Sequence, residues 1–247
     1  MICEKYGVDI EGDVLDFNGV KSYNFLKEKE AIRHTFWETY GDEILPSVYG
    51  ENALAVDGPY EIEEYNVTTN SGDVVFDVGA NLGLFSAYAE DKGCDVYAFD
   101  PGENCVRYLH EQQKLHPQMK IIPIGLSNTI GEQVFYEAAD CALSSFDKDR
   151  IDTENLVEKH IKTDTIDHYV EVNGITKVDY IKADIEGEER NMLMGARNVL
   201  KIMEPKLAIC TYHRTDDPLV LEQIIRAANP RYVVNHAWRK LYAYVPQ

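Results

Sequence analysis

Asp73-Val-Val-Phe-Asp-Val-Gly-Ala-Asn-Leu-Gly-Leu-Phe-Ser86 is the stretch that decides the fold of this 247-residue chain. Its first half is a short apolar run rich in β-branched and aromatic side chains, which predicts a buried parallel strand. Two glycines then mark a turn, and apolar residues at helical spacing predict a helix after it. Because glycines admit a ligand close to the backbone and a helix start offers free N–H groups, this order predicts a nucleotide-like cofactor site.

The residues of the turn favour S-adenosylmethionine over a dinucleotide. A dinucleotide fingerprint needs glycines at its first, third and sixth positions, but counted from Gly79 these positions hold Gly79, Asn81 and Leu84. Asp77 stands two residues before the first glycine, where its carboxylate would repel a pyrophosphate and would suit a ligand that carries an ammonium group. The competing interpretation is that Asp77 caps the turn and that the glycines only permit tight packing.

A second predicted strand, residues 95–99, ends at Asp100-Pro101. An acid about twenty residues after the glycine turn, at the end of a parallel strand, can accept hydrogen bonds from both ribose hydroxyls. An Asp-Pro pair at a strand end is also typical of a helix start, and we favour ribose binding because of the preceding motif. Residues 120–127 predict a third strand, whose end would place Leu126 and Ser127 beside the adenine ring.

Residues 133–136 predict a further short strand, and the polar stretch 140–153 predicts a loop. Within this loop, Ser144-Ser145-Phe146 would be able to close over the cofactor, although disorder is the competing interpretation.

Two later strands end in acids and in a histidine. A strand followed by one helix that continues to Leu200 is predicted by Val178-Asp-Tyr-Ile-Lys-Ala-Asp-Ile-Glu-Gly-Glu188. Asp184 and Glu186 would then lie at the carboxyl end of the strand, facing the cleft in which ligands of such sheets bind. Glu188 and Glu189 are interpreted first as acids that stabilise a helix N-terminus. Lys206-Leu-Ala-Ile-Cys-Thr-Tyr-His213 predicts another buried strand, whose terminal histidine is a candidate for proton handling.

Composition and charge limit the function classes. The formal net charge of −19, without a Lys/Arg-dense face, argues against a nucleic-acid partner. No window suits a membrane span and no basic region followed by an apolar run opens the chain, so a cytoplasmic enzyme without membrane insertion is the default expectation. The five cysteines share no metal-ligand spacing and are expected to be buried or incidental thiols.

The beginning and end of the chain complete the predicted architecture. Residues 14–49 predict an amphipathic helical cap, which would suit a lid or a homodimer contact, and residues 53–70 predict extended segments that line the substrate side or cover a sheet edge. Residues 232–245 predict a closing hairpin. The order of elements therefore predicts a doubly wound α/β fold with a mostly parallel sheet and an antiparallel last strand.

The motifs together resemble one enzyme family. Asp77-Val-Gly-Ala-Asn-Leu-Gly83, Ala98-Phe-Asp-Pro101, Lys182-Ala-Asp-Ile-Glu-Gly-Glu188 and Tyr212-His213, in this order, are similar to FkbM-type S-adenosylmethionine-dependent methyltransferases. The resemblance implies a seven-stranded sheet of the class I methyltransferase type, and methyl transfer most often to a hydroxyl of a sugar or natural product. The resemblance covers roughly residues 55–245. The chain is expected to divide into a helical cap with an extended lead-in, residues 1–70, and an S-adenosylmethionine-binding domain, residues 71–247. Two departures are Asp100, where the family commonly has Glu, and the tail after Asn235.

The resemblance also implies residue roles. Asp184, Glu186 and His213 would face the reacting centre, with Asp184 or His213 as general base and Glu186 orienting the acceptor or the histidine. With the candidates from the residue patterns added, the expected cofactor-binding residues are Asp77, Gly79, Ala80, Asn81, Gly83, Phe85, Asp100, Pro101, Ser127 and Asp184.

Three alternatives stay open at this point. A Mg²⁺ site of Asp184, Glu186 and Asp217 ranks below direct acid–base work, so no metal is assigned. An N-methyltransferase acting on an amine or a nucleotide-linked small molecule would suit an acidic cleft and would need no strong base. A non-catalytic cofactor-binding module is the third alternative.

Overall fold

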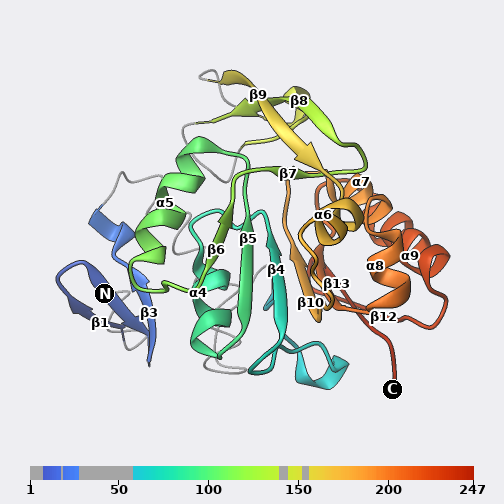
Figure 1. The fold of residues 1–247 in the computed structure, drawn as a ribbon, viewed down its shortest axis with the longest axis horizontal. Coiled ribbons are helices and arrows are strands. Elements are labelled where there is room, and N and C mark those ends of the chain that lie inside the picture. Colours follow the sequence, from blue (N-terminus) through green and yellow to red (C-terminus); the bar gives the residue numbers. More distant parts are fainter. Residues whose placement is uncertain (1–7, 18, 28–57, 139–143, 152–155) are drawn as a thin grey trace.

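A seven-stranded sheet forms the centre of the computed structural model, which describes residues 8–17, 19–27, 58–138, 144–151 and 156–247 (Figure 1). The strand order is β12-β13-β11-β10-β4-β5-β6. The strands are β4 (Val74–Val78), β5 (Asp95–Phe99), β6 (Lys120–Ile122), β10 (Tyr180–Ala183), β11 (Lys206–Cys210), β12 (Val233–Ala237) and β13 (Lys240–Tyr244). β13 runs antiparallel to both of its neighbours, β11 and β12, and the other pairs are parallel, so the predicted doubly wound sheet with an antiparallel last strand is confirmed.

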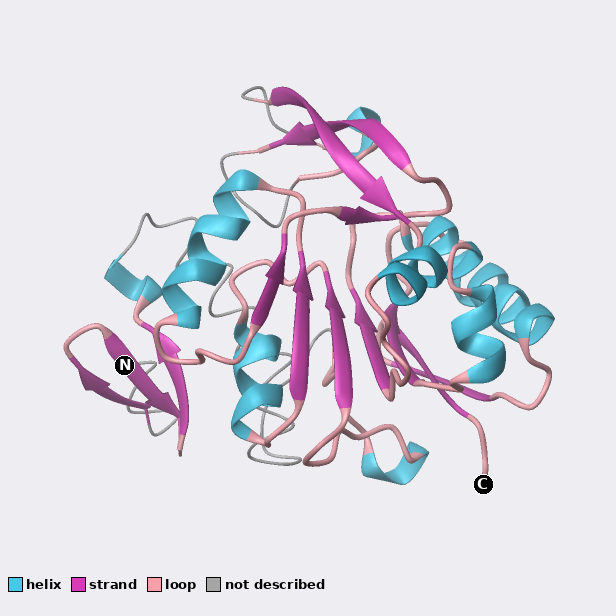
Figure 2. Cartoon of the chain, viewed as in Figure 1, coloured by secondary structure: helices cyan, strands magenta, loops and turns pink. Residues whose placement is uncertain are grey.

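Helices cover both faces of this sheet because its strands are apolar on both sides. Val75 packs with the helices α4 (Leu84–Asp91) and α5 (Glu103–Gln113), while its neighbour Phe76 points into the core on the other side. That second core contains residues of α6 (Ile166–Val172), α7 (Glu189–Met194), α8 (Arg197–Ile202) and α9 (Asp217–Ala228). These four helices lie together at the right of the view in Figure 2.

The described N-terminal residues form strands and not the predicted helix. They are β1 (Val8–Glu11), β2 (Val14–Phe17) and β3 (Val20–Tyr23), followed by a single 3-10 turn, Phe25–Lys27. The helical prediction is therefore wrong over residues 14–17 and 19–27, because Leu15 and Phe17 are buried two residues apart, which is the period of a strand. The rest of that prediction, residues 28–49, lies outside the described residues.

The predicted third strand divides at Pro123, which has no N–H to donate to a sheet. Residues before it form β6, and residues after it leave the central sheet as β7 (Gly125–Leu126). β7 joins a separate three-stranded sheet, in the order β7-β9-β8, with β8 (Gly131–Glu137) and β9 (Val157–Asp164). This small sheet lies beyond the carboxyl ends of the central strands, at the top of the view in Figure 1.

The single helix predicted from Glu188 to Leu200 is two helices, α7 and α8, that meet at Gly195. A Cβ atom at position 195 would collide with the backbone oxygen of Ser127. The helix breaks where the backbone passes too close to its neighbour for a side chain to fit.

Two expectations from composition can be compared with the described residues. Within them, no helix is both long enough and apolar enough to cross a bilayer. Cys94, Cys105 and Cys210 are buried, as predicted.

The first glycine of the turn after β4 has a packing role. Gly79 has a φ of +75°, in the left-handed region that favours glycine, and a Cβ there would collide with the backbone oxygen of Asp184. Gly83 has a φ of +74° and precedes α4, where a Cβ would press on Leu109 of α5. These contacts support the interpretation that the glycines permit tight packing.

Replacing Gly79 by alanine should therefore destabilise the protein by more than the strain of a positive φ alone would. The matched control is Gly174→Ala, at a φ of +62° with nothing within 4 Å of the added Cβ. We expect Gly174→Ala to lower the free energy of unfolding by about 1 kcal/mol and Gly79→Ala by about 3 kcal/mol or more, measured by urea titration. Equal losses in the two variants would contradict a close approach of the two strand ends.

Candidate functional site

A buried ion pair joins β4 to β10 at the edge of the sheet where the candidate site lies. Asp77 and Lys182 are opposite each other in the register of these parallel strands, and Lys182 Nζ lies 2.9 Å from Asp77 Oδ1. Their side chains are 0% and 5% exposed. Lys182 Nζ also donates to the carbonyl of Gly79 at 2.7 Å, and Ser86 Oγ donates to Asp77 Oδ2 at 2.6 Å. Both oxygens of Asp77 thus contact other groups of the protein, so the carboxylate stabilises the glycine turn through Lys182 and Ser86.

Beyond this pair, the turn meets the end of β5. The backbone N–H groups of Asn81 and Gly102 each donate to one oxygen of Asp100 at 2.9 Å. Burial of Asp100 outweighs these hydrogen bonds and raises the pKa of its carboxyl group to about 6. The side-chain Oδ1 of Asn81 is buried and accepts no hydrogen bond within the part of the chain that the structure describes. This corner therefore offers one unused acceptor and a carboxylate that keeps acceptor capacity.

The remaining residues predicted to bind the cofactor lie in different surroundings. Pro101, directly beyond Asp100, is partly exposed, and Ala80 is buried beside α5 and β5. Phe85 packs in the core against Tyr60, with ring centroids 5.3 Å apart. Ser127 is buried, and its Oγ donates to Glu188 Oε1 at 2.6 Å.

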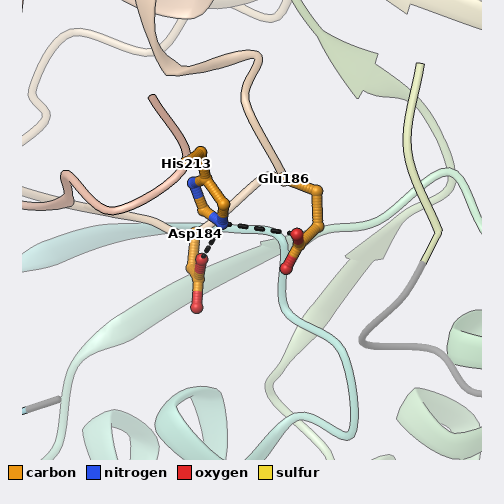
Figure 3. Close-up of side chains that lie close together, drawn as sticks. All are labelled: Asp184, Glu186 and His213. Carbon is orange, nitrogen blue, oxygen red and sulfur yellow. Dashed lines mark ion pairs between the residues drawn. The ribbon is translucent and has the colours of Figure 1, made fainter. Parts of the chain in front are cut away.

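Asp184, Glu186 and His213 converge where β10 and β11 end (Figure 3). His213 Nε2 lies 3.5 Å from Asp184 Oδ1 and 3.3 Å from Glu186 Oε2, and Figure 3 shows this nitrogen directed toward both carboxylates. The other ring nitrogen, Nδ1, lies 2.9 Å from Glu189 Oε1. The three residues that the sequence predicts at the reacting centre are neighbours in the fold.

The charged groups of this cluster shift one another's pKa values. Burial alone would lower the pKa of His213, but hydrogen bonds and charge from Glu186, Glu189 and Asp184 raise it to about 11. Burial raises the pKa of Glu186. For Asp184 the penalty of burial is outweighed by the positive charges of His213, Lys182 and Lys240, which lower its pKa.

Two tyrosines fix the orientation of Asp184. Tyr212 Oη lies 3.0 Å from each oxygen of the carboxylate, to which it donates. Tyr60 Oη donates to Asp184 Oδ2 at 3.3 Å. Tyr60 belongs to the stretch 53–70, whose described part therefore reaches the acid cluster. Ser145, which pairs with Tyr136 of the small sheet, donates from its Oγ to the carbonyl of Glu186 at 3.0 Å.

Sequence reasoning missed two residues of this cluster. Glu189 does lie in the first turn of α7, as predicted, but its side chain contacts His213 and also accepts from the backbone N–H of Ile185 at 2.9 Å. Tyr60 carries no signal beyond its place in an extended stretch. The contact of Glu189 with His213 and that of Tyr60 with Asp184 join segments far apart in sequence, so no local pattern could have revealed them.

Asp217, predicted as a third ligand in the Mg²⁺ alternative, is not part of the cluster. Its carboxylate accepts from Arg190 Nε at 2.6 Å and from the backbone N–H of Arg214 at 2.7 Å. The ligand set of that alternative is therefore not assembled.

The strand order and the acids at the ends of β4, β5 and β10 define a protein with a class I methyltransferase-type fold. The methyltransferase FkbM domain matches residues 77–232, so the chain belongs to the FkbM methyltransferase family. It is 30% identical over 158 residues to the hexuronic acid methyltransferase AglP of Haloferax volcanii; the match covers 63% of this chain and 62% of that protein. The FkbM methyltransferase structure from Methylobacillus flagellatus has the same fold, with a TM-score of 0.55 and 20% identity over 87% of this chain and 54% of that one.

Removing the positive partner of Asp77 should strongly destabilise the protein. Lys182→Met leaves a buried carboxylate unpaired, and we expect a loss of about 3–5 kcal/mol in the free energy of unfolding. Adding Asp77→Asn to Lys182→Met should recover part of that loss, because no charge is then left uncompensated. The control is Lys120→Met, which breaks the half-exposed pair between Lys120 and Asp95 and should cost about 1 kcal/mol or less. Similar losses for Lys182→Met and Lys120→Met in urea unfolding would contradict this assignment.

Proposed function

We propose that this chain is an S-adenosylmethionine-dependent methyltransferase that methylates a hydroxyl of a sugar, a polysaccharide precursor or a natural product. The observation that carries the proposal is the placement of Asp184, held by two tyrosines and a histidine, at the same edge of the sheet as Asn81 and Asp100. The match to a protein named as a hexuronic acid methyltransferase supports a sugar acceptor.

The corner between the glycine turn and β5 fits the cofactor. The buried Oδ1 of Asn81 needs a hydrogen-bond donor, and the ammonium group of the methionine moiety is one. Asp100 would accept hydrogen bonds from the ribose hydroxyls with the lone pairs that Asn81 and Gly102 leave free. Gly79, Ala80 and Pro101 would border the ligand, and Asp77 would act by holding the turn. When bound, S-adenosylmethionine supplies an already activated methyl group.

Asp184 is the general base in this proposal. Both nitrogens of His213 face carboxylates and its side chain is 2% exposed, whereas the Asp184 side chain is 19% exposed. An acceptor hydroxyl can therefore reach the aspartate and not the histidine. Tyr212 and Tyr60 hold the carboxylate in place, and Glu186, which is partly exposed, would orient the acceptor.

We propose that residues 71–247 bind the cofactor and that residues 1–70 contribute to the acceptor side. The hydrogen bond from Tyr60 to Asp184 supports the second part, because it joins the N-terminal region to the proposed general base. An N-methyltransferase and a non-catalytic module are outcomes of the activity test below.

Cofactor binding should depend on the ionised carboxylate of Asp100. Since the pKa of Asp100 is raised to about 6, the group is ionised at pH 8 and mostly protonated at pH 5. We expect the affinity for S-adenosylmethionine, measured by calorimetry, to fall about tenfold from pH 8 to pH 5. Asp100→Asn should bind weakly at both pH values.

The control is Asp95→Asn, which changes an acid at the other end of the same strand, where it pairs with Lys120. Asp95→Asn should keep the affinity and its pH dependence. Wild-type affinity in Asp100→Asn would remove Asp100 from the ribose site. Heat with NAD or ATP but none with S-adenosylmethionine would overturn the proposed function.

Methyl transfer should require Asp184 after the cofactor has bound. With labelled S-adenosylmethionine and a panel of hydroxylated and amine acceptors, Asp184→Asn should bind the cofactor but lower kcat by about 100-fold or more. Labelling of amines alone would favour the N-methyltransferase, and labelling of no acceptor despite tight cofactor binding would favour a non-catalytic module. A wild-type rate in Asp184→Asn would exclude Asp184 as base.

A further inference from the structure

We propose that Asp184, Glu186 and His213 form a binding site for one divalent transition-metal ion, of which Zn²⁺ fits the geometry best. Each side chain offers one ligand atom, and these atoms all lie within 4.8 Å of one another. They stand at the ends of two adjacent parallel strands, so the backbone brings them together without a long loop.

The two separations from the histidine nitrogen to the carboxylate oxygens match those between ligand atoms around a metal. Two ligands bound at about 2.1 Å in tetrahedral geometry are about 3.4 Å apart. His213 Nε2 lies 3.3 Å from Glu186 Oε2 and 3.5 Å from Asp184 Oδ1. Both distances exceed the range of about 2.7–2.9 Å that is typical of a charge-assisted hydrogen bond, whereas the contact from Nδ1 to Glu189 falls within it at 2.9 Å.

The surrounding residues orient the ligand atoms in the way that metal sites require. Metal-binding histidines usually donate their second ring N–H to a carboxylate, which fixes the tautomer and directs the other nitrogen to the ion. Glu189 occupies that position at Nδ1 of His213, and the proton on Nε2 is released to solvent when the ion binds. Tyr212 contacts the carboxylate of Asp184 through hydrogen bonds, as outer residues commonly do for carboxylate ligands.

The donor set selects the class of ion. Mg²⁺ prefers oxygen ligands and retains several waters, whereas an imidazole nitrogen with carboxylates suits Zn²⁺ or another first-row transition ion. Three protein ligands would leave a fourth position open. Resting on the proposed function, that position would receive the acceptor oxygen, and the ion would position it beside Asp184.

The test measures metal binding directly, without cofactor or acceptor. The full chain is stripped with a chelator and titrated with Zn²⁺ by calorimetry, with Mn²⁺ and Mg²⁺ as further arms. We expect one Zn²⁺ per chain with a Kd of about 1 μM or tighter, and much weaker Mg²⁺ binding. Glu186→Gln and His213→Gln should each weaken Zn²⁺ binding about tenfold or more.

The matched control is His236→Gln, because His236 Nε2 also lies 2.9 Å from a glutamate, Glu222, but on the surface and outside the cluster. This variant should bind Zn²⁺ as the wild type does. X-ray absorption of the wild-type zinc complex, which needs no variant to fold, should show imidazole and oxygen ligands and no sulfur.

Three results would overturn the proposal. They are the absence of saturable Zn²⁺ binding up to about 1 mM, unchanged binding in both cluster variants, and sulfur ligation in the absorption spectrum. In the first case, the protonated imidazole of His213 alone would serve as the cation between the two carboxylates. Calorimetry with S-adenosylmethionine is a separate measurement, so failure of the metal site and failure of the proposed function are distinguishable.

Discussion

The buried ion pair between Asp77 and Lys182 is the constraint on which the rest of the site depends. Charged groups are costly to bury unless they are paired, so these two strands must meet in the register that places Asp77 opposite Lys182. Lys182 also holds the Gly79 carbonyl, which fixes the path of the chain into the turn. Asn81 follows the pair on one strand and Asp184 follows it on the other. The pair therefore sets the distance between Asn81 and the acid cluster.

The same close approach changes how the glycine turn is understood. From the sequence, Gly79 looks like a residue that makes room for a ligand. In the fold, its missing side chain makes room for the backbone of Asp184. The groups that we propose to bind the cofactor lie one step further along, in the buried Oδ1 of Asn81 and in the carboxylate of Asp100. A glycine in such a turn can thus serve to let two strand ends meet, while the residues proposed to contact the ligand are its neighbours.

The sequence predicts the central strands well because each is an apolar run that ends in polar residues, as in Asp95 to Asp100. It also predicts which edge of the sheet carries Asp184 and His213, because parallel strands end on the same side. It fails for residues 14–17 and 19–27, where the apolar residues of short strands also fit a helical pattern. The sequence could not show that Glu189 contacts His213, since that contact depends on how α7 packs beside the end of β11 in the tertiary structure. Local sequence patterns thus predict where the strands lie and which residues stand at their carboxyl ends. Contacts between side chains of different elements depend on how those elements pack.

The charge of the acid cluster connects the two proposals. Asp184, Glu186 and Glu189 surround His213, so three carboxylates share one imidazole that can carry a single positive charge. Lys182 and Lys240 contribute positive potential at Asp184, but each also holds a backbone carbonyl elsewhere, Gly79 and Gly58 respectively. A partly buried site with an excess of negative charge attracts a cation. A sulfonium centre and a divalent ion both meet that need, and they differ in where they bind. In the proposed function the sulfonium would belong to a ligand held at Asn81 and Asp100, while the ion would be held by His213 and the two acids beside it, so the two proposed cations would bind at different residues.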